Sequence, residues 1–301
     1  MNRTAQTRAV SPLAIMAAIL AALLLAGTFF DASIAKTLYM PHNVAATLVT
    51  TVGIYPFTAA MVLFLGVACQ RIVKTGKAPA AKALLGGIVA LVALFVGFVG
   101  GASLVDTDCL GGIVPALNKN YAVSAVISLL VEYPLFYVGW RLADKSDDKL
   151  LLKRSLCLVA VLLVAFAFLQ ITKGIFNRPR YRVVAEGLEG VGFVPWFRIS
   201  PKPTDLMATY GLDAGEFRSF PSGHAILSIS TISILLSLTW LFPTLRDKRN
   251  QLCWAGFAFA VVVMLTRLIL GAHYLSDVSA GALIGLGFVF VYDVLQRRIT
   301  S

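Results

Sequence analysis

Residues 155–172 read SLCLVAVLLVAFAFLQIT, a stretch without a single charged side chain. A helix needs about 20 mainly apolar residues to cross the hydrocarbon layer of a membrane. Seven further runs of this kind lie at about 12–30, 44–69, 83–105, 122–140, 223–243, 252–271 and 276–295. The sequence therefore predicts an all-α fold, a polytopic transmembrane bundle of about eight helices.

The composition also favours a membrane protein over a soluble one. Of the 301 residues, 58% are hydrophobic and 14% are charged, whereas soluble domains are about half apolar and a quarter charged. The net charge of +11 could indicate a nucleic-acid partner. The basic residues, however, concentrate in alternate loops, as they do in proteins oriented by cytoplasmic positive charge. We therefore expect the lipid bilayer, and no nucleic acid, as a partner.

The basic loops predict which way the chain faces. Most of the positive charge lies in one set of segments: Arg3 with Arg8, residues 71–82, residues 141–154, residues 246–249, and Arg297 with Arg298. These segments belong in the cytoplasm, and an even number of spans then places both termini there. The pattern suits a bacterial plasma membrane.

One segment on the outer side is basic although orientation does not require it. Between residues 173 and 222 it contains Lys173, Arg178, Arg180, Arg182, Arg198, Lys202 and Arg218. The positive-inside rule acts weakly on long loops, so these cations need another reason. An anionic ligand is the simplest one.

The start of the sixth run, SFPSGH at 219–224, has the features of an anion site. The first turn of a helix has unpaired backbone N–H groups and the positive end of the helix dipole. Ser222 adds a hydroxyl donor, and Gly223 lets a ligand approach the backbone closely. His224 is then placed to give a proton to a leaving oxygen.

A histidine and a carboxylate follow the seventh run. His273 and Asp277 are four residues apart, so on a helix they would share one face. An aspartate there can hold one imidazole nitrogen and leave the other free as a nucleophile. Arg267 could grip a phosphate with two N–H groups of its guanidinium. Taken separately, these patches also fit a helix cap, a helix-end ion pair or cations at a membrane surface; together they favour one phosphate site.

These patches resemble the three signatures of the type 2 phosphatidic acid phosphatase (PAP2) superfamily. The first signature is Lys, six residues, Arg-Pro; Lys173 and Arg180 match it, with Tyr181 in place of the proline. The second, Pro-Ser-Gly-His, is complete at 221–224.

The third signature is Ser-Arg, five residues, His, three residues, Asp. Arg267, His273 and Asp277 match it, with Thr266 in place of the serine. The resemblance covers roughly residues 155–295. It implies a PAP2-like core of six helices, so two of the eight spans are additional.

The resemblance also implies a chemistry, in which the enzyme works through a phosphohistidine intermediate and needs no metal or other cofactor. His273 would be the nucleophile, Asp277 would orient it, and His224 would protonate the leaving alcohol and later assist the attacking water. The phosphate would be bound by the remaining matched residues: Lys173, Arg180, Ser222, Gly223 through its backbone, and Arg267.

The expected organisation has two regions. Residues 1–154 form N-terminal transmembrane helices that include the additional spans. Residues 155–301 form the catalytic PAP2-like region, with an outer loop at 173–222, so the active site faces away from the cytoplasm.

The expected substrate is a membrane lipid that carries a phosphomonoester or a diphosphate, such as phosphatidate, phosphatidylglycerol phosphate or undecaprenyl diphosphate. Two alternatives remain open. One is a membrane phosphotransferase that uses the same phosphate-binding residues. The other is a protein that binds or transports an anionic lipid, supported by Glu132 in the fourth run, because carboxylates inside membranes often mark such paths. The sequence does not indicate an oligomeric state.

Overall fold

The computed structural model describes residues 11–300, and every regular element among them is helical. Eight helical segments are long and apolar enough to cross a membrane. They are Pro12–Leu38 (α1), Val44–Val73 (α2), Pro79–Leu104 (α3), Tyr121–Asp144, Leu151–Thr172 (α7), Gly223–Leu241, Pro243–Ile269 and Leu275–Thr300 (α13). The prediction of an all-α, eight-span bundle is confirmed, and the chain is an integral membrane protein.

Three spans are assembled from shorter helices. The fourth consists of α5 (Tyr121–Ile127), a π-helical turn η2 (Ser128–Glu132) and α6 (Tyr133–Asp144). The sixth consists of α10 (Gly223–Ile229) and α11 (Thr231–Leu241), and the seventh of η4 (Pro243–Lys248) and α12 (Arg249–Ile269). Pro134 has no N–H to donate to the preceding turn, so the break in the fourth span lies where its sequence favours one.

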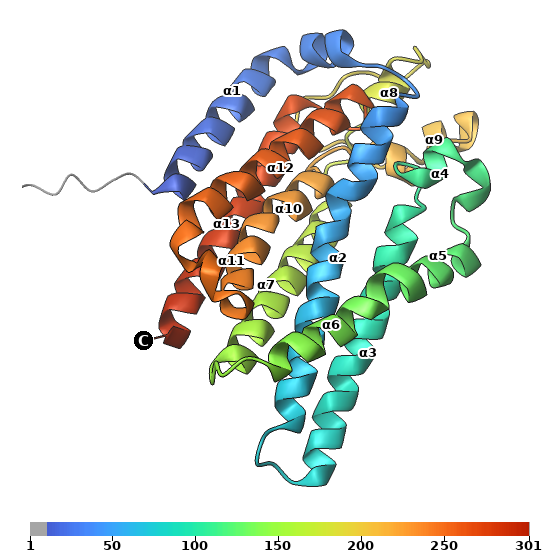
Figure 1. Ribbon diagram of the computed structural model, residues 1–301. Coiled ribbons are helices and arrows are strands. Elements are labelled where there is room, and N and C mark those ends of the chain that lie inside the picture. The colour runs from blue at the N-terminus through green and yellow to red at the C-terminus, as the bar shows by residue number, and fades with distance from the viewer. Residues whose placement is uncertain (1–10, 301) are drawn as a thin grey trace, which may run out of the picture.

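Five short helices lie outside the spans. They are α4 (Leu110–Ile113), η1 (Pro115–Leu117), α8 (Tyr181–Val184), α9 (Thr204–Tyr210) and η3 (Ala214–Phe217). Together with the connections at 39–43 and 270–274, they gather at one end of the bundle, which we call the cavity end (Figure 1). The opposite end holds the connections 74–78 and 145–150 and the C-terminal end of α13.

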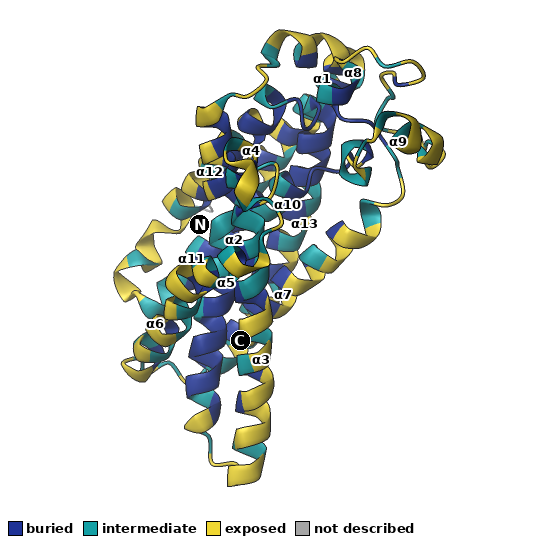
Figure 2. Cartoon of the chain, turned by 90° about the vertical axis from the view of Figure 1, so that its right-hand side faces the viewer, coloured by how far each residue is buried: buried dark blue, intermediate teal, exposed yellow. Residues whose placement is uncertain are grey.

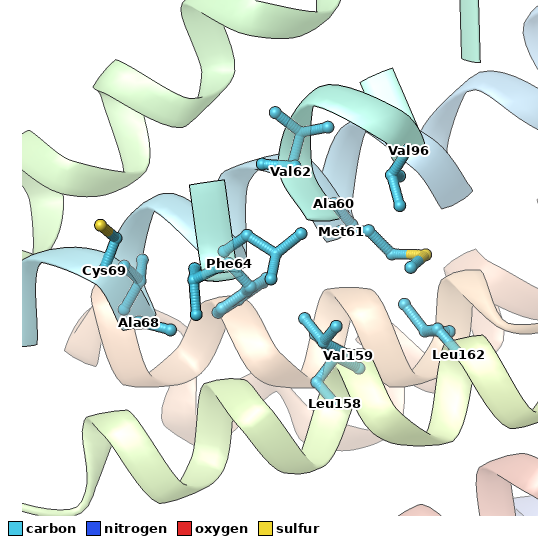
Figure 3. Close-up of a cluster of buried hydrophobic side chains, with 14 of the residues drawn as sticks. Ala60, Met61, Val62, Phe64, Ala68, Cys69, Val96, Leu158, Val159 and Leu162 are labelled. Carbon is cyan, nitrogen blue, oxygen red and sulfur yellow. The ribbon is translucent and has the colours of Figure 1, made fainter. Parts of the chain in front are cut away.

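The centre of the bundle is α2, which has the largest buried share of the eight spans (Figure 2). Around Met61 and Phe64 of α2 pack Val96 of α3 and Leu158 and Leu162 of α7 (Figure 3). Lipid tails are as apolar as these side chains, so close packing rather than exclusion from water holds such helices together.

Glycines allow the closest of these contacts. A Cβ on Gly66 of α2 would lie 2.1 Å from the carbonyl oxygen of Phe136, and one on Gly139 of α6 would lie 2.0 Å from that of Leu63. The backbones of α2 and α6 therefore touch, as small residues permit in membrane helices.

The first helix extends further than its apolar run predicts. The run was expected to end near residue 30, but α1 continues to Leu38. Asp31 does not end the helix because its carboxylate is buried and paired with Arg178. α1 lies along α13 (Figure 1), and a Cβ on Gly27 would lie 2.6 Å from the backbone nitrogen of Ser276.

The N-terminal helices thus belong to the same bundle as the second half of the chain. Besides the contact of α1 with α13, α2 packs against α7, α10 and α12. The division at residues 154 and 155 stays a prediction. So does the orientation in the membrane, because Arg3 and Arg8, on which it partly rests, lie outside the described residues.

Candidate active site

A cavity of about 670 Å³ lies at the cavity end of the bundle. Towards the spans its wall is apolar, with Ile54 of α2, Val99 of α3, Phe166 of α7 and Leu227 of α10. Its other side is polar and carries both signs of charge: Asp106, Asp108, Lys119, Arg182, Asp213, Glu216 and Arg218. The cavity therefore joins an apolar environment to a strongly charged one.

The structure brings the predicted site residues together around this cavity. Five of them line it: Lys173, Arg180, Gly223, His224 and His273. The other three, Ser222, Arg267 and Asp277, are fully buried and do not line it.

His273 lies in the turn between α12 and α13, two residues before α13 begins. Its Nδ1 lies 2.6 Å from the backbone carbonyl oxygen of Ser219. Because a carbonyl oxygen can only accept a hydrogen bond, Nδ1 carries the proton and the lone pair of Nε2 is free. Burial, followed by the positive charges of Arg267 and Arg180, holds the pKa of His273 well below its usual range. The imidazole is therefore neutral at pH 7.

The expected helical pairing of His273 with Asp277 is not present, because His273 precedes the helix. His273 Nδ1 and Asp277 Oδ2 are 3.9 Å apart, too far for a hydrogen bond. Asp277 instead accepts hydrogen bonds from Ser219 Oγ at 2.6 Å and from the backbone N–H of Tyr274 at 2.8 Å. It is connected to His273 through Ser219, whose carbonyl oxygen holds the imidazole.

Asp277 also belongs to a group of buried polar residues that we call the sealed cluster: Asp31, Arg178, Ser276 and Asp277. Arg178 pairs with Asp277 and, at 2.8 Å, with Asp31. Asp31 accepts a further hydrogen bond from the backbone N–H of Ser276 at 2.9 Å. The Arg178 guanidinium lies 4.1 Å from the centre of the Tyr274 ring. The side chains of both ion pairs are at most 1% exposed, so the cluster is shielded from the cavity and from water.

Lys173 and His224 meet at the start of α10. Lys173 follows the last residue of α7, and a Cβ on Gly223 would lie 3.2 Å from Lys173 Nζ. Because position 223 is glycine, the Lys173 ammonium group has room beside the start of α10. Ser222 is the N-cap of this helix. Burial, followed by the charge of Arg180, lowers the pKa of Lys173 to about 8. His224 Nε2 is buried and has no hydrogen-bond partner among the described residues.

The remaining cations converge on Asp108, in a group that we call the open cluster: Asp108, Arg180, Arg182 and Arg267. Asp108 Oδ2 lies 2.8 Å from Arg180 Nη1 and 2.6 Å from Arg267 Nη2. Its Oδ1 lies 2.7 Å from Arg182 Nη1. Burial alone would raise the pKa of Asp108, but the arginines, Arg180 foremost, hold it well below its usual range. Asp108 is therefore an anion at neutral pH.

Two acidic residues of these clusters were not among the predicted site residues. Asp31 could have been noticed, because it is the only acidic residue within α1 and charged residues inside membrane spans are costly unless they are paired. Asp108 lies in the connection between α3 and α4, and no local pattern marks it.

The PAP2 superfamily model matches residues 154–300 of this chain. We call these residues the PAP2 region. Among curated proteins, a lipid A 1-phosphatase of Rhizobium johnstonii is 35% identical over 82 residues, which are 27% of this chain and 30% of that protein. The match thus spans less than a third of the relative's length. No solved structure matches the chain.

The PAP2 region contains all eight predicted site residues, whereas Asp31 and Asp108 precede it. Both halves of the chain therefore contribute charged groups to the site. Across residues 11–300, no group of three or more His, Cys, Asp or Glu side chains is arranged to hold a metal ion.

Proposed function

We propose that this protein is a membrane phosphatase that hydrolyses lipid phosphomonoesters or diphosphates through a phosphohistidine on His273. The proposal is carried by one observation: the neutral imidazole of His273, with its proton held on Nδ1, lines a cavity beside Lys173 and Arg180. A neutral nucleophile next to fixed cations is what attack on an anionic phosphate requires.

In the first step, His273 Nε2 attacks the phosphorus atom. A P–N bond forms while the P–O bond to the lipid breaks, and protonated His224 gives its proton to the leaving oxygen. In-line transfer of this kind spreads negative charge over the three equatorial oxygens. Lys173 and Arg180, which line the cavity, stabilise that charge. The buried Arg267 adds positive charge next to Arg180, and its Nε and Nη1 have no partner among the described residues.

In the second step, water attacks the phosphohistidine. His224, now neutral, takes a proton from the water as the new P–O bond forms and the P–N bond breaks. Inorganic phosphate leaves, and His273 returns to its neutral state. The reaction needs no metal ion, and Asp277 contributes by fixing Ser219 and hence the orientation of the imidazole.

The proposed substrate is a lipid because the cavity has an apolar wall formed by residues of four spans and a charged rim. The partial similarity to a lipid A 1-phosphatase agrees with this class. We also propose, from the basic loops at the opposite end, that the cavity end faces away from the cytoplasm.

The test is release of phosphate by purified protein in detergent, with EDTA present. The panel contains phosphatidate, phosphatidylglycerol phosphate, undecaprenyl diphosphate and a lipid A 1-phosphate. We expect wild type to release phosphate from at least one of them. His273→Ala should reduce the rate by about 10³-fold or more, because the covalent route is lost.

Retained activity in His273→Ala would exclude His273 as the nucleophile. Loss of wild-type activity on chelation would exclude the metal-free reaction. Lipid dephosphorylation without release of inorganic phosphate, with the group found on a second acceptor, would identify a phosphotransferase.

A further inference from the structure

We propose that Asp108, which lies outside the PAP2 region, is a positioning residue of the phosphate site. Its carboxylate holds the guanidinium groups of Arg180 and Arg267 so that their remaining N–H groups are presented to the phosphate. The inference rests on the proposed function for its ligand, and it adds a residue from the N-terminal half to the site.

Asp108 binds only some of the N–H groups on the guanidinium groups of Arg180 and Arg267. Arg180 uses Nη1 and Arg267 uses Nη2 to bind Asp108 Oδ2. Arg180 Nε and Arg267 Nε and Nη1 are buried and have no partner among residues 11–300. A buried N–H group without a partner is costly, and three of them on two adjacent cations are suited to bind an anion.

The place of that anion is beside the catalytic histidines. Arg180 lines the cavity together with His224 and His273, and His224 Nε2 is a further buried nitrogen without a partner in the described part of the chain. Asp108 therefore binds only some of the N–H groups of Arg180 and Arg267. It binds one part of each arginine and leaves the other part for a phosphoryl group.

The chain around Asp108 holds the carboxylate in a defined position. A Cβ on Gly111 would lie 2.3 Å from the carbonyl oxygen of Val105 and 2.8 Å from that of Asp106, so the turn is tightly closed. The neighbouring Cys109 is 1% exposed and donates its backbone N–H to the carbonyl oxygen of Asp106 at 2.9 Å. Arg182 binds the second carboxylate oxygen, and its guanidinium also pairs with Glu216.

A different role for Asp108 makes the opposite prediction. If its carboxylate occupied the place of the phosphate, removing its charge would free the arginines and tighten phosphate binding. If it positions them, removing the charge releases the guanidinium groups from their geometry and weakens binding. The sign of the change in phosphate affinity decides between the two.

The experiment compares the full-length protein in detergent as wild type, Asp108→Asn, Asp108→Glu and Asp106→Asn. Two quantities are measured: equilibrium binding of inorganic phosphate, and kcat and KM for the lipid phosphate that wild type hydrolyses best. Asp106 is the matched control, because it is an acidic residue of the same turn that lines the cavity and makes no ion pair with a described arginine. Thermal unfolding in the same detergent shows which variants are folded.

We expect Asp108→Asn to bind phosphate about tenfold more weakly and to lower kcat by about tenfold or more, since small errors of position cost much in rate. Asp106→Asn removes an equal charge from the same turn without freeing an arginine, so it should change both quantities less than Asp108→Asn does. Asp108→Glu keeps the charge but moves the carboxylate by about one bond length, so we expect values between wild type and Asp108→Asn.

Unchanged or tighter phosphate binding in folded Asp108→Asn would overturn the positioning role. If that variant does not fold, Asp108→Glu decides, and wild-type values there would overturn it. If wild type binds phosphate but hydrolyses no ester, the proposed function fails while the binding comparison still tests Asp108. If wild type binds no phosphate, both proposals fail.

Discussion

The sealed cluster and the open cluster both combine aspartate with arginine near His224 and His273. They differ in whether their side chains can be reached from the cavity. In the sealed cluster, Arg178 and Asp277 have no exposed surface. In the open cluster, the Asp108 side chain is 10% exposed and lines the cavity. The sealed cluster joins α1, the connection between α7 and α8, and α13. The open cluster joins the connection after α3 to the cations of the PAP2 region.

This difference separates two tasks. In the sealed cluster no ligand can reach Arg178, so its pairs can only hold the backbone and Ser219 in place. In the open cluster, Arg180 and Arg267 keep N–H groups without a partner among residues 11–300. In our proposal these groups bind the phosphate while both arginines remain paired with Asp108. We infer that the sealed cluster fixes the geometry of the site, whereas the open cluster, in which Asp108 and Arg180 line the cavity, binds the ligand.

The most severe way to break the sealed cluster is Asp277→Asn. The substitution removes the anion that Arg178 and Ser219 bind, and breaking a buried pair costs about 3 kcal/mol or more. We expect the thermal midpoint to fall, and kcat to fall by about 10²-fold because Ser219 no longer fixes the imidazole. Phosphate release per folded molecule and thermal unfolding in detergent measure the two effects.

Asp293→Asn is the matched control for this variant. Asp293 lies on the same helix and pairs with Arg249 and Arg297, far along α13 from the site. It should lose some stability and keep kcat within about twofold. Equal losses of kcat in both variants would mean that the sealed cluster has no special relation to His273.

Asp31→Asn tests the sealed cluster at a residue that reaches His273 only through Arg178, Asp277 and Ser219. It weakens the pairing with Arg178 and Ser276 but leaves Asp277 in place. We expect kcat to fall by about tenfold and the free energy of unfolding by about 1–3 kcal/mol, read out by the same two assays. A larger effect on kcat than that of Asp277→Asn would contradict the path through Ser219.

The smallest expected effect concerns the cavity side and appears only at alkaline pH. The pKa of Lys173 is lowered to about 8, so Lys173 is charged below that pH and loses its proton above it. The charged fraction of Lys173 therefore falls about tenfold between pH 7 and pH 9, and kcat/KM should fall by up to that factor. His273 is neutral throughout because its pKa lies well below its usual range. Lys173→Arg keeps its charge in this range, so its profile should lack the alkaline fall; the same fall in both proteins would assign it to another group.

The sequence predicted those features that depend on neighbouring residues. The lengths of the apolar runs predicted the eight spans, and the pattern at 219–224 predicted a helix start, which the structure places at Gly223 with Ser222 as its cap. The break after α10 and the π-helical turn at Ser128–Glu132 were not predicted. The π-helical turn depends on packing between helices, for example on the hydrogen bond from Ser128 Oγ to the carbonyl oxygen of Gly97.

The ion-pair partners of the charged residues could not be predicted from patterns of neighbouring residues in the sequence. Asp31 and Arg178 are 147 residues apart in the chain, and Asp108 and Arg267 are 159 apart. No periodicity relates such positions, so only the packing of the helices reveals them. The role of Asp277 shows the same limit: the four-residue spacing was correct, but His273 lies before the helix and bonds to Ser219.

The contact of Asp31 with Ser276 has a consequence for biosynthesis. The first and last spans pack against each other, and Ser276 and Asp277 of the last span belong to the sealed cluster. Asp31 and Arg178 therefore lack their full set of partners until the last helix has entered the membrane. Until then Arg178 lacks the Asp277 carboxylate and Asp31 lacks the Ser276 N–H, and incompletely paired charges are costly at a membrane. The proposed catalytic centre is therefore complete only when the last helix is in place, and we expect a truncated or incompletely inserted chain to be inactive.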